Sequence, residues 1–177
     1  MMRWTPRKAD TLAALAAEIL HNYRRGRVVV GVDGLVGSGM LPFADALAAA
    51  IAEAGHEVHR ASHDTVDDAS FRRAVIDPFR AGGDSGTAAA PASDAPAVLV
   101  VDGTMLQRPA LRGAFAFTVW LDVQRAVAAE RRPERATAEE VDAEARYLAE
   151  VAPRGRASAI IDTTDIDAPR RVFADSC

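Results

Sequence analysis

The chain has 177 residues, 49% hydrophobic and 26% charged, which predicts one globular domain with a substantial core. Its formal net charge of −4 argues against a general nucleic-acid or membrane-surface binder, because such proteins carry a basic patch. The single cysteine, Cys177, excludes an intrachain disulfide. Because the sequence also has no long apolar span and no signal-peptide pattern, we expect a soluble, cytoplasmic protein.

The first part of the chain, residues 1–26, contains a predicted amphipathic helix. Apolar residues recur at helical spacing from Ala9 to Tyr23. A buried strand is then predicted from Arg27 to Val32, and an alanine-rich helix from Gly39 to Ala54. The order is therefore a strand, a glycine-rich loop and a helix.

The stretch from Gly34 to Leu41 has the glycine spacing of a phosphate-binding loop. In such loops backbone N–H groups surround phosphate oxygens, a lysine reaches the β- and γ-phosphates, and a Ser or Thr hydroxyl binds Mg²⁺. Met40 and Leu41 stand at the lysine and hydroxyl positions, and apart from Lys8 every basic residue is an arginine. We therefore expect the frame of a nucleotide site with weakened Mg-ATP chemistry. The candidate nucleotide-binding residues of the loop are Gly34, Gly37, Ser38, Gly39, Met40 and Leu41.

Apolar strands and helical patterns alternate through the rest of the chain. Strands are predicted at 57–61, 97–101, 116–121 and 157–161, and helices at 123–130, 138–151 and 70–76, the last ended by Asp77 and Pro78. Residues 82–96 are mostly Gly, Ala, Ser, Pro and Asp, and predict a mobile loop. The alternation predicts an α/β fold, a P-loop NTPase-like three-layer sandwich with a five-stranded parallel sheet.

Acidic residues follow the predicted strands, where ligands of parallel sheets bind. They are Asp33, Asp64, Asp102, Asp122 and Asp162. An acidic cleft at the mouth of a glycine loop suits a Mg-nucleotide. For Asp64 and Asp102 the alternative is helix capping or solvation at the strand ends.

On these motifs, over residues 27–170, the chain resembles the uridine kinase-like family of P-loop kinases, in its actinobacterial branch. Residues 32–39 resemble the family's V-D-G-x-x-G-S-G, and Ser62-His63-Asp64 resembles its S-x-D-x-F with Val66 in place of the phenylalanine. Residues 77–83, Asp-Pro-Phe followed by Gly-Gly, are similar to its D-P-L-x-x-G-G, and residues 146–150 to its R-x-Y-L-x-E.

This resemblance implies in-line transfer of the γ-phosphoryl group of ATP to a hydroxyl of a nucleoside or another small molecule. Asp64 would accept the proton, and Mg²⁺ would bridge phosphates held with Asp102 and the loop hydroxyl. Asp64 and Asp102 are thus the implied catalytic and magnesium-binding residues. Lid arginines would neutralise the transition state, and the candidates are Arg131, Arg132 and Arg135.

The chain departs from the family at the phosphate-binding loop and at the acceptor pocket. The loop lysine and hydroxyl are replaced, and the insertion that shapes the acceptor pocket has shrunk to residues 82–96. The arginine run is more often a solvated face than a phosphate clamp. Two hypotheses remain. One is a small-molecule kinase that is slow or uses an unusual donor, with ATP and Mg²⁺ as its cofactors if it is active. The other, which we favour, is a non-catalytic member that keeps the fold to bind a nucleotide, a metabolite or a partner protein, with residual phosphate binding at the loop.

Overall fold

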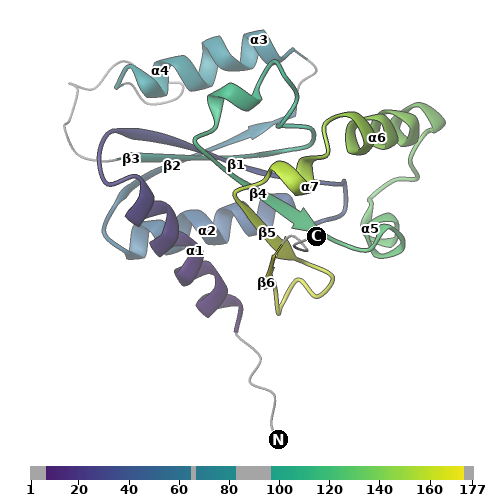
Figure 1. Cartoon of the computed structure of the whole chain (residues 1–177), viewed down its shortest axis with the longest axis horizontal. Helices are drawn as coiled ribbons and strands as arrows, with labels where there is room; N and C mark the ends of the chain where they lie inside the picture. Colours follow the sequence, from purple (N-terminus) through teal and green to yellow (C-terminus); the bar gives the residue numbers. More distant parts are fainter. Residues whose placement is uncertain (1–6, 65–66, 83–96, 174–177) are drawn as a thin grey trace, which may run out of the picture.

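The computed structural model describes residues 7–64, 67–82 and 97–173 as a six-stranded sheet with helices on both faces (Figure 1). The sheet order is β2-β3-β1-β4-β5-β6, and all neighbouring strands are parallel except β5 and β6. The strands are β1 Arg27–Gly34, β2 Glu57–His63, β3 Ala97–Gly103, β4 Phe117–Asp122, β5 Ala159–Asp162 and β6 Arg170–Val172. The α-helices are α1 Lys8–Asn22, α2 Met40–Glu53, α3 Asp68–Phe71, α4 Asp77–Arg80, α5 Arg125–Arg131, α6 Ala138–Glu150 and α7 Pro153–Arg156. A π-helical segment, η1 Arg72–Ile76, joins α3 to α4, and a 3₁₀ turn, η2 Arg112–Ala114, precedes β4.

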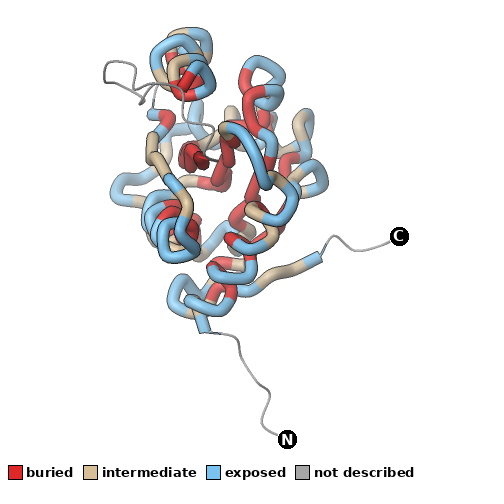
Figure 2. Tube along the Cα trace, turned by 90° about the vertical axis from the view of Figure 1, so that its left-hand side faces the viewer, coloured by how far each residue is buried: buried red, intermediate tan, exposed pale blue. Residues whose placement is uncertain are grey.

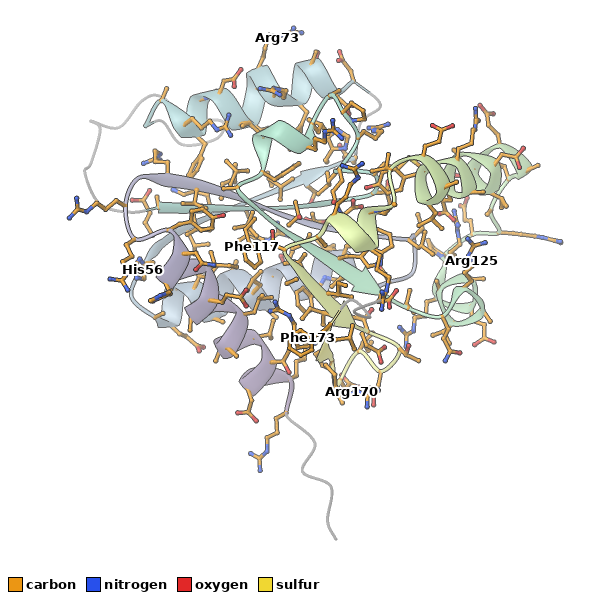
Figure 3. All side chains as sticks on the ribbon, in the orientation of Figure 1. His56, Arg73, Phe117, Arg125, Arg170 and Phe173 are labelled. Atoms are coloured by element: carbon orange, nitrogen blue, oxygen red, sulfur yellow. The ribbon has the colours of Figure 1, made fainter. Side chains whose placement is uncertain are left out.

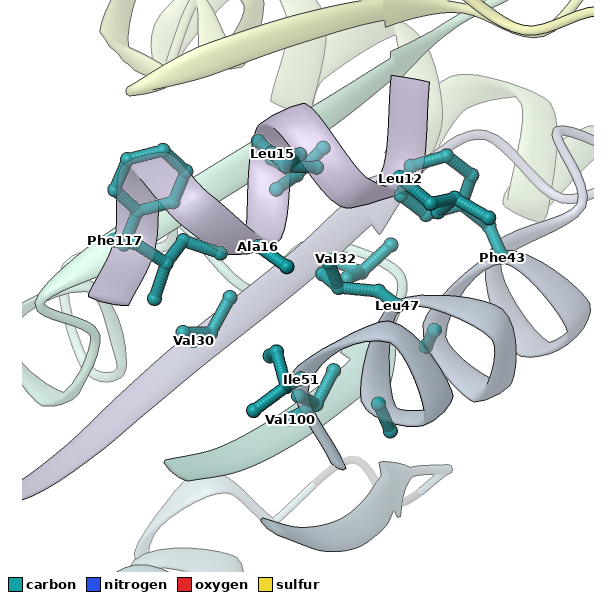
Figure 4. Packing of buried hydrophobic residues seen from close by; sticks show 14 of the residues in the cluster. Leu12, Leu15, Ala16, Val30, Val32, Phe43, Leu47, Ile51, Val100 and Phe117 are labelled. Carbon is teal, nitrogen blue, oxygen red and sulfur yellow. The ribbon is translucent and has the colours of Figure 1, made fainter. Parts of the chain in front are cut away.

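The core lies on both faces of the sheet because successive side chains of a strand point to opposite sides. Val30 and Val32 of β1 pack with Leu15 of α1 and Leu47 of α2 (Figure 4). Val29 faces the other side and packs in the cluster that includes the α3–α4 segment. Figure 2 shows these buried segments in the middle of the molecule, with exposed helix surfaces around them. The predicted three-layer α/β sandwich is therefore confirmed.

A third cluster of buried side chains ties the glycine loop to the other end of the chain. Its members are Leu35, Trp120, Ala128, Tyr147 and Ile160. They come from the loop, β4, α5, α6 and β5. The packing of α5 and α6 therefore bears directly on the loop after β1.

None of the helices that the structure describes is long and apolar enough to cross a lipid bilayer.

The sheet has six strands, so the prediction of five was one strand short. The chain turns back after β5, where the backbone N–H of Thr164 donates to Asp162 and that of Asp167 to Asp165, and Arg170–Val172 then pairs antiparallel with β5. This strand has only three residues, two of them arginines, and therefore lacks the apolar run by which the other strands were predicted.

The helix predicted at 70–76 does not end at Asp77-Pro78. Helical backbone runs from α3 through η1 and α4 to Arg80. Proline lacks an N–H and its ring crowds the preceding turn, and the wider π-helical turn before Pro78 accommodates both effects. Of the loop predicted at residues 82–96, all but Gly82 lies outside the described residues.

Candidate functional site

The loop between β1 and α2 has the backbone shape that its glycines predict. Gly37 and Gly39 have φ angles of +94° and +86°, which residues with a side chain rarely adopt. Gly37 also packs so closely on α5 that a Cβ there would lie 2.1 Å from the carbonyl oxygen of Ala128. Two conditions, a left-handed backbone and a close approach, therefore require glycine at position 37.

Four backbone N–H groups of this loop have no hydrogen-bond acceptor among the described residues. Within the part of the chain that the structure describes, the N–H groups of Gly37, Gly39, Met40 and Leu41 donate to no acceptor, whereas that of Ser38 donates to Leu35 at 2.9 Å. The last two belong to the first turn of α2, where helix N–H groups have no partner within the helix. Together these four donors form a cradle suited to an anion such as a phosphate.

Neither side chain that follows the glycines can supply the missing chemistry. Met40 packs against the hydrophobic core on the α1–α2 face of the sheet. Leu41 is 54% exposed. Positions 40 and 41 therefore offer backbone donors but neither a cation nor a hydroxyl ligand for a metal, and the loop's one hydroxyl, Ser38 Oγ, is buried without a hydrogen-bond partner among the described residues.

Asp102, the predicted metal-binding residue at the end of β3, is already engaged by β2. The structure pairs Ser62 with Asp102 across the two strands. Arg60 Nη2 lies 2.7 Å and Ser62 Oγ 2.8 Å from the same carboxylate oxygen, Asp102 Oδ1. Asp102 is only 6% exposed, so the Arg60 guanidinium is the positive charge that balances a nearly buried carboxylate.

Asp64 stands one residue beyond β2, on the same edge of the sheet as Asp102. It is exposed and has no hydrogen-bond or ion-pair partner among the residues placed in the structure. Strand pairing thus brings the two predicted catalytic carboxylates to neighbouring strand ends. No cluster of three or more His, Cys, Asp or Glu that could hold a metal occurs in the described ranges.

Asp33, at the start of the loop, is fully buried and accepts two hydrogen bonds. Its Oδ1 accepts a hydrogen bond from the N–H of Gly34 at 2.9 Å, and its Oδ2 accepts one from the hydroxyl of Tyr147 on α6. The backbone N–H groups of Leu106 and Gln107 also favour its charged form, and that of Gln107 donates to the Tyr147 hydroxyl at 3.2 Å. Burial raises the pKa of Asp33 to about 6, although all of these donors lower it. The pKa of Tyr147 is raised as well, first by burial and then by the charge of Asp33.

The three candidate lid arginines make different contacts. Arg131 donates to the backbone carbonyls of Thr163 and Thr164 at 2.9 and 2.6 Å, and so holds the turn after β5. Arg132 pairs with Glu144 of α6 at 3.0 Å. Arg135 is exposed. Two of the three side chains therefore hold parts of the fold together, and their role as phosphate clamps stays a prediction.

Sequence reasoning missed the pairing of Arg60 with Asp102 and the bond between Tyr147 and Asp33. In the sequence Tyr147 stood out only as part of the motif at residues 146–150, whereas its hydroxyl also anchors Asp33, at the start of the loop. The available signal for Arg60 was an arginine within a predicted strand, two residues before Ser62.

Solved structures resemble this fold. A possible uridine kinase from Bacillus stearothermophilus is 22% identical with a TM-score of 0.63, over 85% of this chain and 97% of its own. A candidate fructose transport system kinase from Silicibacter sp. TM1040 is 21% identical with a TM-score of 0.57, over 83% of this chain and 89% of its own. No family model matches the chain, and no match is found among curated proteins. The chain therefore has the fold of P-loop kinase-like proteins.

The residues at the loop do not fit Mg-ATP in the way that this fold commonly binds it. Met40 and Leu41 replace the lysine and the hydroxyl ligand, and Asp102 is hydrogen-bonded to the guanidinium of Arg60. The four free N–H groups do fit a phosphate group.

Proposed function

We propose that this chain is a P-loop protein of kinase ancestry that binds a phosphate group or nucleotide at residues 34–41 and has lost efficient phosphoryl transfer. The observation that carries the proposal is the combination of an open backbone cradle with a neutralised Asp102. The cradle can hold an anion without a metal. By ancestry the substrates would be ATP and a hydroxyl of a nucleoside or another small molecule.

The size of the loss supports impaired catalysis. A hydrogen bond to a charged group contributes about 1.5–3 kcal/mol, and we assign a contribution of this size both to the missing lysine–phosphate contact and to the missing hydroxyl–Mg²⁺ contact. Every 1.36 kcal/mol corresponds to a factor of ten, so the two losses together amount to roughly 10²- to 10⁴-fold. Phosphoryl transfer depends mostly on positioning and electrostatic stabilisation, and the missing cation and metal ligand belong to that machinery.

Calorimetric titration with ATP, in Mg²⁺ and in EDTA, tests the proposal on the native chain and two variants. The first variant is Met40→Lys with Leu41→Thr, and the second adds Arg60→Ala to release Asp102. We expect weak, magnesium-independent binding by the native chain, and tighter binding by the double variant. A clear magnesium requirement should come only with the triple variant. Arg170→Ala, at an exposed ion pair with Asp162, controls for the loss of one arginine.

Two outcomes contradict the proposal. Tight, magnesium-dependent binding by the native chain would mean that another group replaces the lysine, and the chain would then be an active kinase. No binding by the native chain and no gain in either variant, with folding verified by circular dichroism, would mean that the loop holds no phosphate. The chain would then be a scaffold or partner-binding protein that keeps the fold.

A further inference from the structure

A pocket separate from the phosphate cradle lies beside the glycine loop, between α5 and α6. Its volume is about 410 Å³, within the range of sites for small molecules. Most of its lining is apolar, with Leu35 and Val36 from the loop, Ala128 from α5, and Val141, Ala145 and Leu148 from α6. Neither Asp64 nor Asp102 lines it, and neither do the four cradle residues, Gly37, Gly39, Met40 and Leu41.

Arginines also line this apolar space. Arg125, Arg132 and Arg135 take part in the lining, with Glu144 as the acidic residue. Arg132 is paired with Glu144 at 3.0 Å, but Arg125 and Arg135 have no ion-pair or hydrogen-bond partner in the placed part of the chain. Figure 3 shows Arg125 beside α5 and α6. Two positive charges are thus left unbalanced at the edge of an apolar pocket in a protein with a net charge of −4.

We propose that this pocket binds a small amphiphilic monoanion. The apolar body packs against Leu35, Ala128 and Leu148, and the anionic group lies between the guanidinium groups of Arg125 and Arg135. Arginine suits this role because its planar fork of donors matches the oxygens of an acidic group and stays charged at every physiological pH. The pocket borders the same loop as the phosphate cradle, through Leu35 and Val36, but does not depend on the function proposed for the cradle.

The fluorescent sulfonate 8-anilinonaphthalene-1-sulfonate and its uncharged analogue N-phenyl-1-naphthylamine form a matched pair of probes. We expect the native protein to bind the sulfonate at least about tenfold more tightly than the neutral compound. Arg125→Gln and Arg135→Gln should each lower the affinity for the sulfonate by about tenfold and leave the affinity for the neutral probe unchanged. Arg73→Gln, on η1 at the top of the view in Figure 3 and away from Arg125, should leave binding of both probes unchanged.

Two further variants place the site in this pocket. Ala145 is an exposed residue of α6, so Ala145→Trp should fill the pocket and abolish binding of both probes without unfolding the protein. Val141 also lines the pocket and is 50% exposed. Val141→Glu adds a negative charge there and should lower the affinity for the sulfonate only. Dodecanoate should displace the sulfonate, whereas inorganic pyrophosphate at the loop should not.

Equal affinity for the charged and neutral probes, or arginine variants without effect, would overturn the proposal. Displacement by pyrophosphate would assign the probe to the phosphate cradle instead. Because ATP titration of Ala145→Trp reports on the loop separately, failure of this proposal is distinguishable from failure of the phosphate site.

Discussion

Gly37 packs directly on the backbone of α5. Replacement by alanine would combine a positive φ angle with a Cβ 2.1 Å from a backbone oxygen that cannot rotate away. We expect Gly37→Ala to lower the free energy of unfolding by at least about 2 kcal/mol, measured by urea denaturation. Gly26 provides a matched control, because its φ is +80° but nothing lies within 4 Å of an added Cβ. Gly26→Ala should cost about 1 kcal/mol, and equal losses would mean that the contact with α5 is unimportant.

Asp33 makes the stability of the protein depend on pH. Its pKa rises from an ordinary value of 3.8 to about 6 on folding, so between these values the folded state binds more protons than the unfolded state. The stabilising contribution is complete below about pH 4 and is lost as the pH rises through about 6. A shift of this size corresponds to roughly 2–3 kcal/mol.

Asp33→Asn removes this titration and separates it from that of other carboxylates. Relative to the variant, the native protein should lose roughly 2–3 kcal/mol between pH 4 and pH 7.5, measured by urea unfolding at a series of pH values. The groups whose pKa values are lowered, such as Asp162, titrate in both proteins and cancel in the difference. A constant difference between the two proteins across this range would show that Asp33 does not titrate there.

Among the elements, α4 is fixed to the sheet through one aromatic residue. Phe79 is fully buried, its ring lies under the guanidinium of Arg27 at 4.6 Å, and it meets the ring of His59 edge to face. Arg27 also donates to the carbonyl oxygen of Phe79. These contacts join the end of the α3–α4 segment to β1 and β2.

Removing that ring should open a cavity on this face of the sheet. We expect Phe79→Ala to lower the free energy of unfolding by about 3–5 kcal/mol, again by urea denaturation. Phe173 also lies beside an arginine, Arg171, but is 77% exposed, so Phe173→Ala should change stability by no more than about 0.5 kcal/mol. A loss below 1 kcal/mol at Phe79 would show that α4 is held mainly by its backbone contacts.

Sequence patterns identify elements that bury apolar side chains, which is why β1, α2 and β3 were predicted within a few residues. The short β6 was missed because pairing with β5, and not hydrophobicity, makes it a strand. At the site, glycine spacing predicts the shape of the loop because the needed φ angles belong almost only to glycine. The bond from Arg60 to Asp102 depends on how β2 and β3 align, which a single sequence does not specify.

At the scale of the whole molecule, the clusters on the two faces share the same central strands. Val30 and Val100 contribute to the α1–α2 face, while Val29 and Val101 contribute to the opposite face. Loss of either layer would therefore expose strands on which the other layer packs. Trp120, only 3% exposed, belongs to the third cluster and reports on the packing of α5 and α6 beside the loop.

This arrangement predicts that the chain unfolds as one cooperative unit. In a Trp4→Phe variant, where Trp120 is the single tryptophan, the urea transition followed by tryptophan fluorescence should coincide in midpoint and slope with that followed by far-ultraviolet circular dichroism. Fluorescence reports local packing near the loop, whereas dichroism reports the helices and strands together. A fluorescence transition at lower urea would mean that α5 and α6 separate from the sheet before it unfolds, and the chain would then consist of two units instead of one domain.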